Sequence, residues 1–199
     1  MPWPDPVILQ GEFASLVPLQ AEHADALALA SSDGEVWRAW YTNVPAPEDM
    51  ASEIERRLAE QQASRMLPFT VLDADGAPVG MTTYMNIDAS SPRLEIGSTW
   101  YAQRVQRTTL NTQCKRLLLT HAFESLACIA VEFRTSSFNR ASRRAIERIG
   151  AKPDGILRNH CRHRNGTLRD TCVYSILESE WPGVRVQLDA MLGRGPLDL

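Results

Sequence analysis

The sequence predicts an α/β fold, a mixed layered domain built on a mostly antiparallel sheet. Segments that alternate apolar and polar residues, as strands do, are interleaved with Ala- and Leu-rich segments of helical spacing. The pairs Asp75-Gly76 and Asn165-Gly166 each separate two strand-like segments and predict hairpins. The chain shows no repeat, low-complexity tract or linker, so we expect a single domain over residues 1–199.

The N-terminal half is predicted to contain two hairpins with two helices between them. In chain order we expect strands at 7–10 and 14–19, helices at 21–31 and 47–65, and strands at 67–73 and 79–87. Pro47 suits a first helical turn because its missing N–H has no intrahelical partner there, and Glu48 and Asp49 suit the positive helix end. The connection between the helices, at 36–41, is aromatic.

The C-terminal half alternates strands and helices before it closes in a hairpin. We expect strands at 94–101, 129–135, 156–163 and 171–177, and helices at 112–126, 141–149 and 180–192. Gly150 follows a predicted helix as a C-cap, and Pro182 lies in the first turn of the last helix. The predicted order is therefore ββ-αα-βββ-α-β-α-ββ-α.

Composition and charge exclude several classes of protein. The net charge of −3 and the isoelectric point near 5.8 argue against non-specific nucleic-acid binding. No apolar run approaches the roughly 18 residues that span a bilayer, so we expect no membrane partner. The first six residues, Met-Pro-Trp-Pro-Asp-Pro, lack a signal-peptide pattern, so we expect a cytoplasmic protein.

The cysteines do not form a recognisable metal or disulfide pattern. None of Cys114, Cys128, Cys161 and Cys172 lies in a CxxC motif, so we expect reduced and mostly buried thiols. The segment 158–164 holds one cysteine and two histidines, but hairpin residues alternate faces and no second ligand cluster exists. We therefore predict no metal site.

A polar loop between the strand at 93–101 and the following helix has the features of an anion site. A strand that turns directly into a helix directs several backbone N–H groups, and the positive helix end, towards one point. The loop also contains Arg104 and Arg107, which suit a pyrophosphate. It lacks the glycines that let a backbone approach phosphate closely, so a plain connection is the alternative.

Four segments in this order resemble the GNAT superfamily of N-acetyltransferases, in particular the ribosomal-protein N-terminal acetyltransferase (Rim-type) branch. They are Val79-Gly80, the strand segment 94–100, Gln106-Arg107 in the polar loop, and the segment 139–150. The resemblance covers about residues 10–180. It implies the GNAT fold, with helices on both faces of the sheet and a bulge that splays two central strands into a wedge for acetyl-CoA.

The resemblance also implies an activity. We expect an acetyl-CoA-dependent N-acetyltransferase that moves an acetyl group directly, in a ternary complex, to a primary amine. The acceptor is a protein N-terminus or a small-molecule amine. Two alternatives stay open, a non-catalytic acyl-CoA-binding or regulatory module and a GNAT transferase that uses a different acyl-CoA. Homodimer formation is left open.

Two residues are candidates for the chemistry. An amine must lose a proton before it attacks a thioester, and the leaving thiolate needs a hydrogen-bond donor. Glu95, in the strand at 94–101, could act through water as the general base, or it could face solvent. The resemblance assigns Ser142 to the thiolate, although a serine near a helix start can instead bond its own backbone.

The resemblance places cofactor contacts on the strand end, the polar loop and the helix at 141–149. These are Trp100, Tyr101, Val105, Gln106, Arg107, Thr108, Thr109, Leu110, Asn111, Thr112, Asn139 and Arg143. Thr109 replaces a family glycine. We expect this β-branched residue to disfavour positive φ and to crowd a phosphate, or else to donate its hydroxyl to it. Asn139 could cap its helix as well as contact the cofactor.

A basic group and an acceptor site complete the predictions. The arginines could meet the 3′-phosphate of coenzyme A or form a solvated helix face; they are Arg134, Arg140, Arg143 and Arg144. The acceptor contacts are predicted to be Trp37, Tyr41, Tyr84 and Asn86, with the last hairpin beside them. Asp88 would suit a cationic amine, and Trp37 with Trp40 could instead be core residues.

Overall fold

The computed structural model describes residues 3–193, so the outermost residues of the predicted domain, and the first two of the N-terminal segment, lie outside the described range. The strands are β1 (Leu9–Gln10), β2 (Ala14–Pro18), β3 (Met66–Asp73), β4 (Pro78–Asp88), β5 (Arg93–Tyr101), β6 (Ala130–Ser136), β7 (Lys152–Arg162) and β8 (Leu168–Leu177). The α-helices are α1 (Ala24–Ser32), α2 (Met50–Gln62), α3 (Leu110–Thr120), α4 (Arg140–Arg148) and α5 (Trp181–Met191). Each predicted element is present, with its ends shifted by a few residues.

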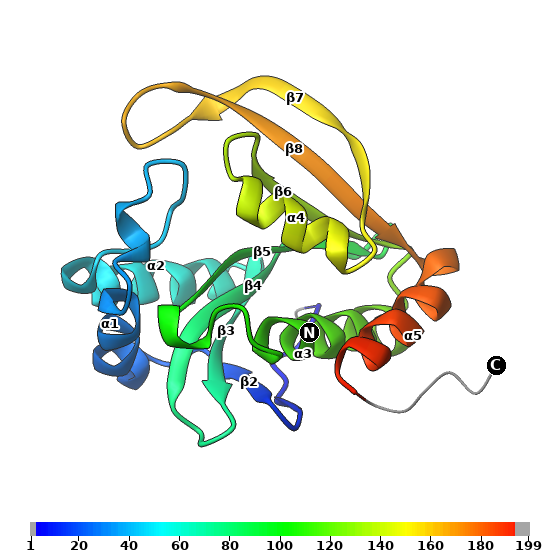
Figure 1. Cartoon of the computed structure of the whole chain (residues 1–199), viewed down its shortest axis with the longest axis horizontal. Helices are drawn as coiled ribbons and strands as arrows, with labels where there is room; N and C mark the ends of the chain where they lie inside the picture. The colour runs from blue at the N-terminus through cyan, green and yellow to red at the C-terminus, as the bar shows by residue number, and fades with distance from the viewer. Residues whose placement is uncertain (1–2, 194–199) are drawn as a thin grey trace.

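The strands form one sheet in the order β1-β2-β3-β4-β5-β6-β8-β7 (Figure 1). Neighbouring strands pair antiparallel except β5 and β6, which are parallel. The chain reaches β6 from β5 through α3, because a parallel neighbour requires a crossover connection. The prediction of a mixed, mostly antiparallel sheet is confirmed.

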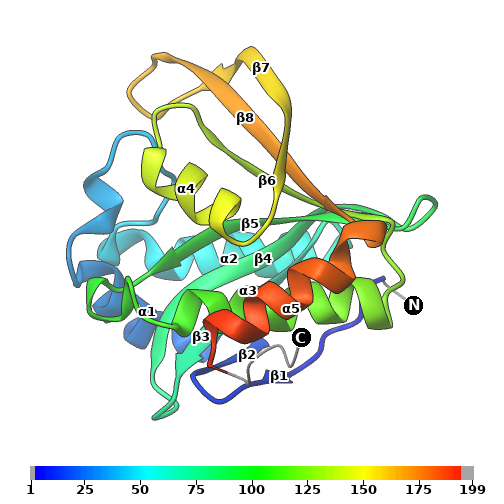
Figure 2. The ribbon, with the colours of Figure 1, turned by 45° about the vertical axis from the view of Figure 1, so that its right-hand side comes forward.

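Helices cover both faces of the sheet, as predicted (Figures 1 and 2). Helices α1 and α2 pack on one face, where Leu27 and Ile54 join a buried cluster with Met81 of β4. Helices α3, α4 and α5 pack on the other face around a larger cluster, which includes Leu118 and Leu188. The two cores lie on opposite sides of the strands that will form the site, so the site is supported from both faces.

Helix α3 begins two residues earlier than the predicted helix at 112–126. Thr108 accounts for this start, since its Oγ1 accepts the Leu110 N–H at 3.2 Å and donates to the Val105 carbonyl at 2.8 Å. Thr109 is the N-cap residue. Beyond Thr120 the helix continues as a π-helical turn over His121–Ser125, which accounts for the rest of the predicted span.

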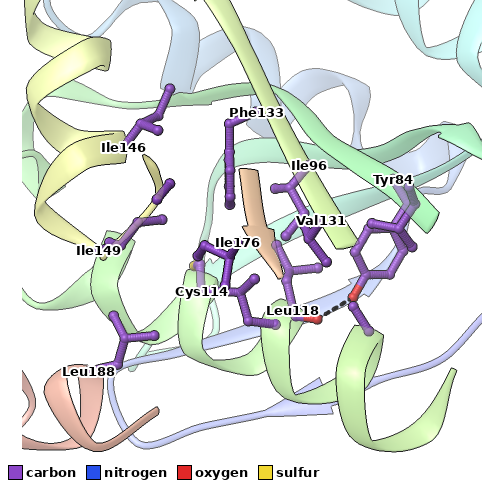
Figure 3. Close-up of a cluster of buried hydrophobic side chains, with 14 of the residues drawn as sticks. Tyr84, Ile96, Cys114, Leu118, Val131, Phe133, Ile146, Ile149, Ile176 and Leu188 are labelled. Atoms are coloured by element: carbon purple, nitrogen blue, oxygen red, sulfur yellow. Dashed lines mark hydrogen bonds between the residues drawn. The ribbon is translucent and has the colours of Figure 1, made fainter. Parts of the chain in front are cut away.

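Tyr84 belongs to the core, and its predicted contact with the acceptor is wrong (Figure 3). Its side chain is completely buried, and its hydroxyl donates to the Leu118 carbonyl of α3 at 2.6 Å. The ring packs edge-on against Phe69, with 5.5 Å between centroids. Strand residues alternate faces, and the register of β4 turns Tyr84 towards α3 rather than towards α2.

The buried hydroxyl of Tyr84 should contribute measurably to stability. Tyr84→Phe removes the donor to Leu118 and should lower the free energy of unfolding by about 1 kcal/mol, the usual net value of one hydrogen bond. Urea denaturation of both proteins measures this difference. Tyr41→Phe is the control, since within residues 3–193 its hydroxyl makes no hydrogen bond. An unchanged unfolding free energy for Tyr84→Phe would contradict the assigned contact.

Candidate active site

The central feature of the site is the point at which β5 and β6 separate (Figure 2). Their parallel pairing covers Arg93 to Glu95 on β5 and Ala130 to Glu132 on β6. Each strand then continues, β5 to Tyr101 and β6 to Ser136, and over this stretch of the described chain they are not paired with each other. The splayed strands expected from the sequence are therefore confirmed. The edge of β5 that faces β6 leaves backbone groups available to a ligand.

A β-bulge bends β5 just after the last paired residue. Ser98 and Thr99 of β5 oppose a single residue of β4, Thr82, and Ser98 has a left-handed φ of 49°. The buried Lys115 of α3 donates from Nζ to Thr99 Oγ1 at 2.9 Å, and Thr99 lies 2.8 Å from the Thr82 hydroxyl. Burial lowers the pKa of Lys115 to about 8. This polar cluster holds the bulge against α3.

Glu95 lies at the separation point and is buried, with 5% of its surface exposed. Asn86 Nδ2 donates to Glu95 Oε2 at 2.6 Å. Gly97 makes room for the carboxylate, because a Cβ at Gly97 would lie 2.8 Å from Glu95 Oε1. Burial raises the pKa of Glu95, and the hydrogen bond from Asn86 and the charge of Arg134 oppose this rise.

Asn86 is placed differently from the predicted acceptor contact. A second bulge, between β4 and β5, includes Asn86 with a left-handed φ of 48°. Simple alternation would put Asn86 on the same face as Tyr84, but the bulge lets its side chain reach Glu95. Asn86 therefore orients the carboxylate.

A second carboxylate, missed by the sequence analysis, lies beside Glu95. Glu132 is the partner of Glu95 in the parallel ladder and is also buried. Arg134 donates to Glu132 Oε2 from Nη2 at 2.8 Å and from Nε at 3.0 Å, and Arg93 donates to Glu132 Oε1. The alternation in Val131-Glu132-Phe133-Arg134 was the available signal, since it places two charges on one face of a central strand.

This placement corrects the predicted role of Arg134. The sequence grouped it with the arginines of α4 near the 3′-phosphate. The structure instead places it on the opposite face of β6 from the Phe133 core, 3.6 Å from Glu95 Oε2. Arg140 and Arg144 of α4 are exposed, as a solvated basic face would be.

The polar loop presents Arg107. Its φ is 62°, its side chain is exposed, and it makes no ion pair within residues 3–193. Thr109 has an ordinary φ of −68°, as expected of a β-branched residue that disfavours positive φ, and Arg107 takes the left-handed conformation in this loop. The effect of Thr109 on a phosphate stays a prediction. Arg104 is engaged elsewhere, 3.6 Å from Asp33 and 3.7 Å from Asp73.

Several residues predicted to contact the cofactor have side chains that pack inside the protein. The side chains of Trp100 and Leu110 lie in the two cores, and Val105 packs against both. Thr112 is buried and accepts a hydrogen bond from Arg148 at 3.2 Å. A ligand could reach Trp100, Leu110 and Thr112 through the backbone alone, which is the kind of contact predicted for Trp100, and their cofactor contacts stay a prediction.

The rest of the loop is tied together by hydrogen bonds. Tyr101 donates from its hydroxyl to Asn111 Oδ1 at 3.0 Å, and Gln106 Nε2 donates to the Tyr101 carbonyl at 3.0 Å. The exposed side chains of the loop include Gln106, Arg107, Thr108 and Thr109. The start of α3 is thus held rigidly against the end of β5.

Helix α4 begins beside the same opening. Asn139 caps it, with Oδ1 accepting the Ser142 N–H at 3.0 Å, so the predicted capping role is confirmed. The Ser142 hydroxyl has no hydrogen-bond partner in the described chain, which leaves it available to a ligand. Arg143 Nε donates to the Tyr174 hydroxyl at 3.0 Å, which in turn donates to Glu147 Oε1 at 2.9 Å. Its role towards a cofactor stays a prediction.

The aromatic connection meets the last hairpin, as the sequence analysis expected. The Trp40 ring lies 4.9 Å from the His163 ring and 5.2 Å from the Phe138 ring. Tyr41 packs against Trp40 at 5.6 Å, and the Trp37 ring lies under the Arg38 guanidinium at 5.0 Å. A pocket of about 500 Å³ lies against this connection and the β7–β8 turn. Segments far apart in the sequence therefore meet at this pocket.

Two other charged side chains, Asp88 and Arg169, have contacts that the sequence did not predict. Asp88 Oδ1 accepts the N–H groups of Ser90 and Ser91 at 2.9 and 3.1 Å, so it stabilises the β4–β5 turn, and its role towards an amine stays a prediction. Arg169 of β8, which the sequence analysis missed, makes no ion pair within the described residues. Its charge acts on Glu95. This charge lowers the pKa of Glu95, as the charge of Arg134 does.

The cysteines are free thiols; Cys114, Cys128 and Cys172 are buried and Cys161 is exposed. Within residues 3–193, no group of three or more His, Cys, Asp or Glu side chains could hold a metal ion. Over the same residues, every helix is too short or too polar to cross a lipid bilayer.

Two parallel strands part beside the start of α3, with a buried carboxylate at the separation point, and this is the wedge that the resemblance to acetyl-CoA-dependent transferases implies. A profile described as "Acetyltransferase (GNAT) domain" matches residues 15–152, and the chain belongs to this family. The family resemblance drawn from the sequence is confirmed.

Known proteins agree with this assignment. The chain is 35% identical over 109 residues to the "Putative ribosomal N-acetyltransferase YdaF" of Bacillus subtilis (strain 168), a match over 55% of this chain and 58% of that protein. A GCN5-related N-acetyltransferase from Brucella melitensis is 32% identical, with a TM-score of 0.86 over 96% of this chain and 87% of that one. RimJ of Mycobacterium smegmatis in complex with CoA-disulfide shares the fold at 23% identity, with a TM-score of 0.78 over 96% of each chain.

The raised pKa of Glu95 predicts a pH-dependent effect on stability. Folding disfavours the charged form, so the native state binds more protons than the unfolded chain between about pH 4.3, the usual glutamate pKa, and the raised native pKa. The stability of the parent therefore falls as pH rises through that window. Glu95→Gln has no such proton to lose.

We expect the free energy of unfolding of Glu95→Gln, measured relative to that of the parent, to be higher at pH 7 than at pH 4. Urea denaturation of both proteins across pH 4–8 measures this. Glu60→Gln is the control, because Glu60 lies in an exposed ion pair with Arg65 on α2. A difference between parent and Glu95→Gln that does not change with pH would contradict the assigned environment of Glu95.

Proposed function

We propose that this protein is an acetyl-CoA-dependent N-acetyltransferase whose acceptor is a primary amine at a protein N-terminus. The observation that carries the proposal is the position of Glu95. A buried carboxylate of raised pKa lies where β5 and β6 part, beside the backbone edge that the separation leaves open. A general base is most effective when its pKa approaches the working pH, so this environment suits proton removal from an amine.

The residues around the opening fit coenzyme A. The start of α3 supplies N–H groups and the positive helix end, and Arg107 adds an exposed guanidinium without an ion-pair partner in the described chain. The open edge of β5 can pair with the amides of the pantetheine arm as a neighbouring strand would. When bound, acetyl-CoA supplies an activated acetyl thioester.

Two side chains are placed to handle protons on either side of that thioester. Glu95 accepts the proton of the acceptor amine through water, with its Oε2 held by Asn86 and its Oε1 directed over Gly97. The Ser142 hydroxyl donates a hydrogen bond to the leaving thiolate. It is available because the cap formed by Asn139 uses only the backbone N–H of Ser142.

The acceptor is proposed to enter over Trp40 and the last hairpin. Aromatic rings at this place offer apolar surface to the side chains of a peptide. Arg169 offers an unneutralised cation to peptide carbonyl oxygens near Glu95. The name of the Bacillus subtilis relative supports a ribosomal protein as the source of the N-terminus.

Cofactor binding is tested by Arg107→Ala. We expect calorimetry to show binding of coenzyme A to the parent and a loss of about 1.5–3 kcal/mol in the variant, the usual value of a hydrogen bond to a charged group. Arg185→Ala, on the exposed face of α5, should bind as the parent does. Equal affinities of the parent and Arg107→Ala would remove Arg107 from the site, and absence of binding to the parent would overturn the proposed function.

Catalysis is tested by Glu95→Gln. With a panel of peptide N-termini and small amines, release of free coenzyme A identifies the acceptor. Glu95→Gln should then lower kcat by roughly 10²–10⁴-fold and leave the affinity for coenzyme A nearly unchanged. Since Glu95 must be ionised to accept a proton, parent activity should fall as pH drops through its raised pKa, and Glu95→Gln should lack this limb.

Ser142→Ala should lower kcat less, because water can replace the hydroxyl as a donor. Full activity of Glu95→Gln with an unchanged pH profile would show that Glu95 is structural. Binding of acetyl-CoA without turnover of any acceptor would instead identify a non-catalytic module, and preferential turnover of a longer acyl-CoA would identify a different acyl donor.

A further inference from the structure

We propose that Glu132 is a positioning residue for Glu95, acting through Arg134: it holds the Arg134 guanidinium and so keeps Arg134 from closing onto the Glu95 carboxylate. This inference rests on the proposed function, in which Glu95 is the general base. It concerns a residue on the strand next to Glu95.

The contacts of Arg134 are unequal. Its two donors reach Glu132 Oε2 at 2.8 and 3.0 Å, whereas its Nε lies 3.6 Å from Glu95 Oε2, beyond hydrogen-bonding distance. Both carboxylates project from the same face of adjacent strands, at paired positions of the parallel ladder. A small rotation of the Arg134 side chain would exchange one carboxylate for the other.

The two carboxylates also differ in how fully they are paired. Glu132 has both oxygens engaged, Oε1 by Arg93 and Oε2 by Arg134. Within the described chain, Glu95 accepts a hydrogen bond from Asn86 alone, at Oε2. Both arginines therefore bind Glu132, and Glu95 Oε1 has no hydrogen bond in the described chain and can accept a proton.

This division matters because a neighbouring arginine lowers the pKa of a carboxyl by about 1–3 units, and the effect grows as the two charges approach. A Glu95 paired closely with Arg134 would be a weaker base. Glu132 keeps this ion pair at 3.6 Å, without a hydrogen bond, and its own two arginines offset the burial of this second carboxylate.

Other groups face Glu95 from the neighbouring elements. The side chains from β4 are the neutral Asn86 and Met85. From β8, Arg169 acts on Glu95 through its charge, without an ion-pair contact in the described chain. On α2, Glu53 and Arg57 pair with each other at 2.7 Å, over Thr83. Within residues 3–193, Arg134 alone lies within ion-pairing distance of Glu95.

The test is the titration of Glu95, followed by NMR of ¹³C-labelled glutamate carboxyls in the folded protein, with Glu95→Gln assigning its signal. In Glu132→Gln, Arg134 loses its charged partner and turns to Glu95, so the midpoint should fall by about one pH unit or more. In Arg134→Gln the midpoint should rise. Glu60→Gln, which breaks the exposed ion pair with Arg65, should leave it unchanged.

The double variant Glu132→Gln/Arg134→Gln separates positioning from simple repulsion between two carboxylates. If Glu132 acts through Arg134, adding Glu132→Gln to Arg134→Gln should move the midpoint little, and the coupling in this double-mutant cycle should be large. If Glu132→Gln shifts the Glu95 midpoint as much in the Arg134→Gln variant as in the parent, Glu132 acts by its own charge, which would overturn the proposal. So would equal midpoints in the parent and both single variants.

Glu132→Asp keeps the charge and should restore most of the parent midpoint, which provides a measurement should Glu132→Gln fold poorly. The titration does not depend on turnover, so it separates this inference from the proposed function. A shifted midpoint with unchanged kinetics would leave Glu132 as the positioning residue of a carboxylate that is not the base. If Glu95 is the base, the acidic limb of the kcat profile should move with the NMR midpoint in each variant.

Discussion

The short parallel pairing of β5 with β6 is the contact on which the rest of the site depends. It covers three residues of each strand and ends at Glu95 and Glu132. Before that point the sheet is continuous, and the two cores hold it from both faces. After it, the twist of the sheet and the bulge at Ser98 carry β5 away from β6. A longer ladder would close the opening, and a shorter one would leave the two carboxylates without a fixed register.

The charges at this point are arranged so that the protein tolerates two buried carboxylates and still keeps one of them basic. Glu132 is neutralised by Arg93 and Arg134, whereas Glu95 has a neutral donor, Asn86, and a more distant cation. In the first arrangement the two arginines offset the burial of Glu132, and the second costs stability at neutral pH because burial disfavours the ionised form. A pKa raised by burial in this way is common at functional sites where a group must take up a proton.

The elements could be predicted from the sequence because each depends on local patterns. Alternation identified the strands, and the Asp75-Gly76 and Asn165-Gly166 pairs identified two hairpins. The wrong site predictions share a different cause. Tyr84 was assigned to the acceptor side although the register of β4 turns it towards α3. Arg134 was grouped with the arginines of α4, although the pairing of β6 places it beside Glu95.

The sequence by itself determined the order of elements, the family and the residue types available for chemistry, since periodicity, turn residues and motif spacing are all properties of neighbours along the chain. Only the tertiary structure decided which of these residues meet. Glu95 and Glu132 are 37 positions apart, and their contact depends on a parallel register that no local pattern encodes. The faces of Asn86 and Arg134 were likewise set by bulges and strand pairing, because one extra residue in a strand reverses the direction of the side chains that follow.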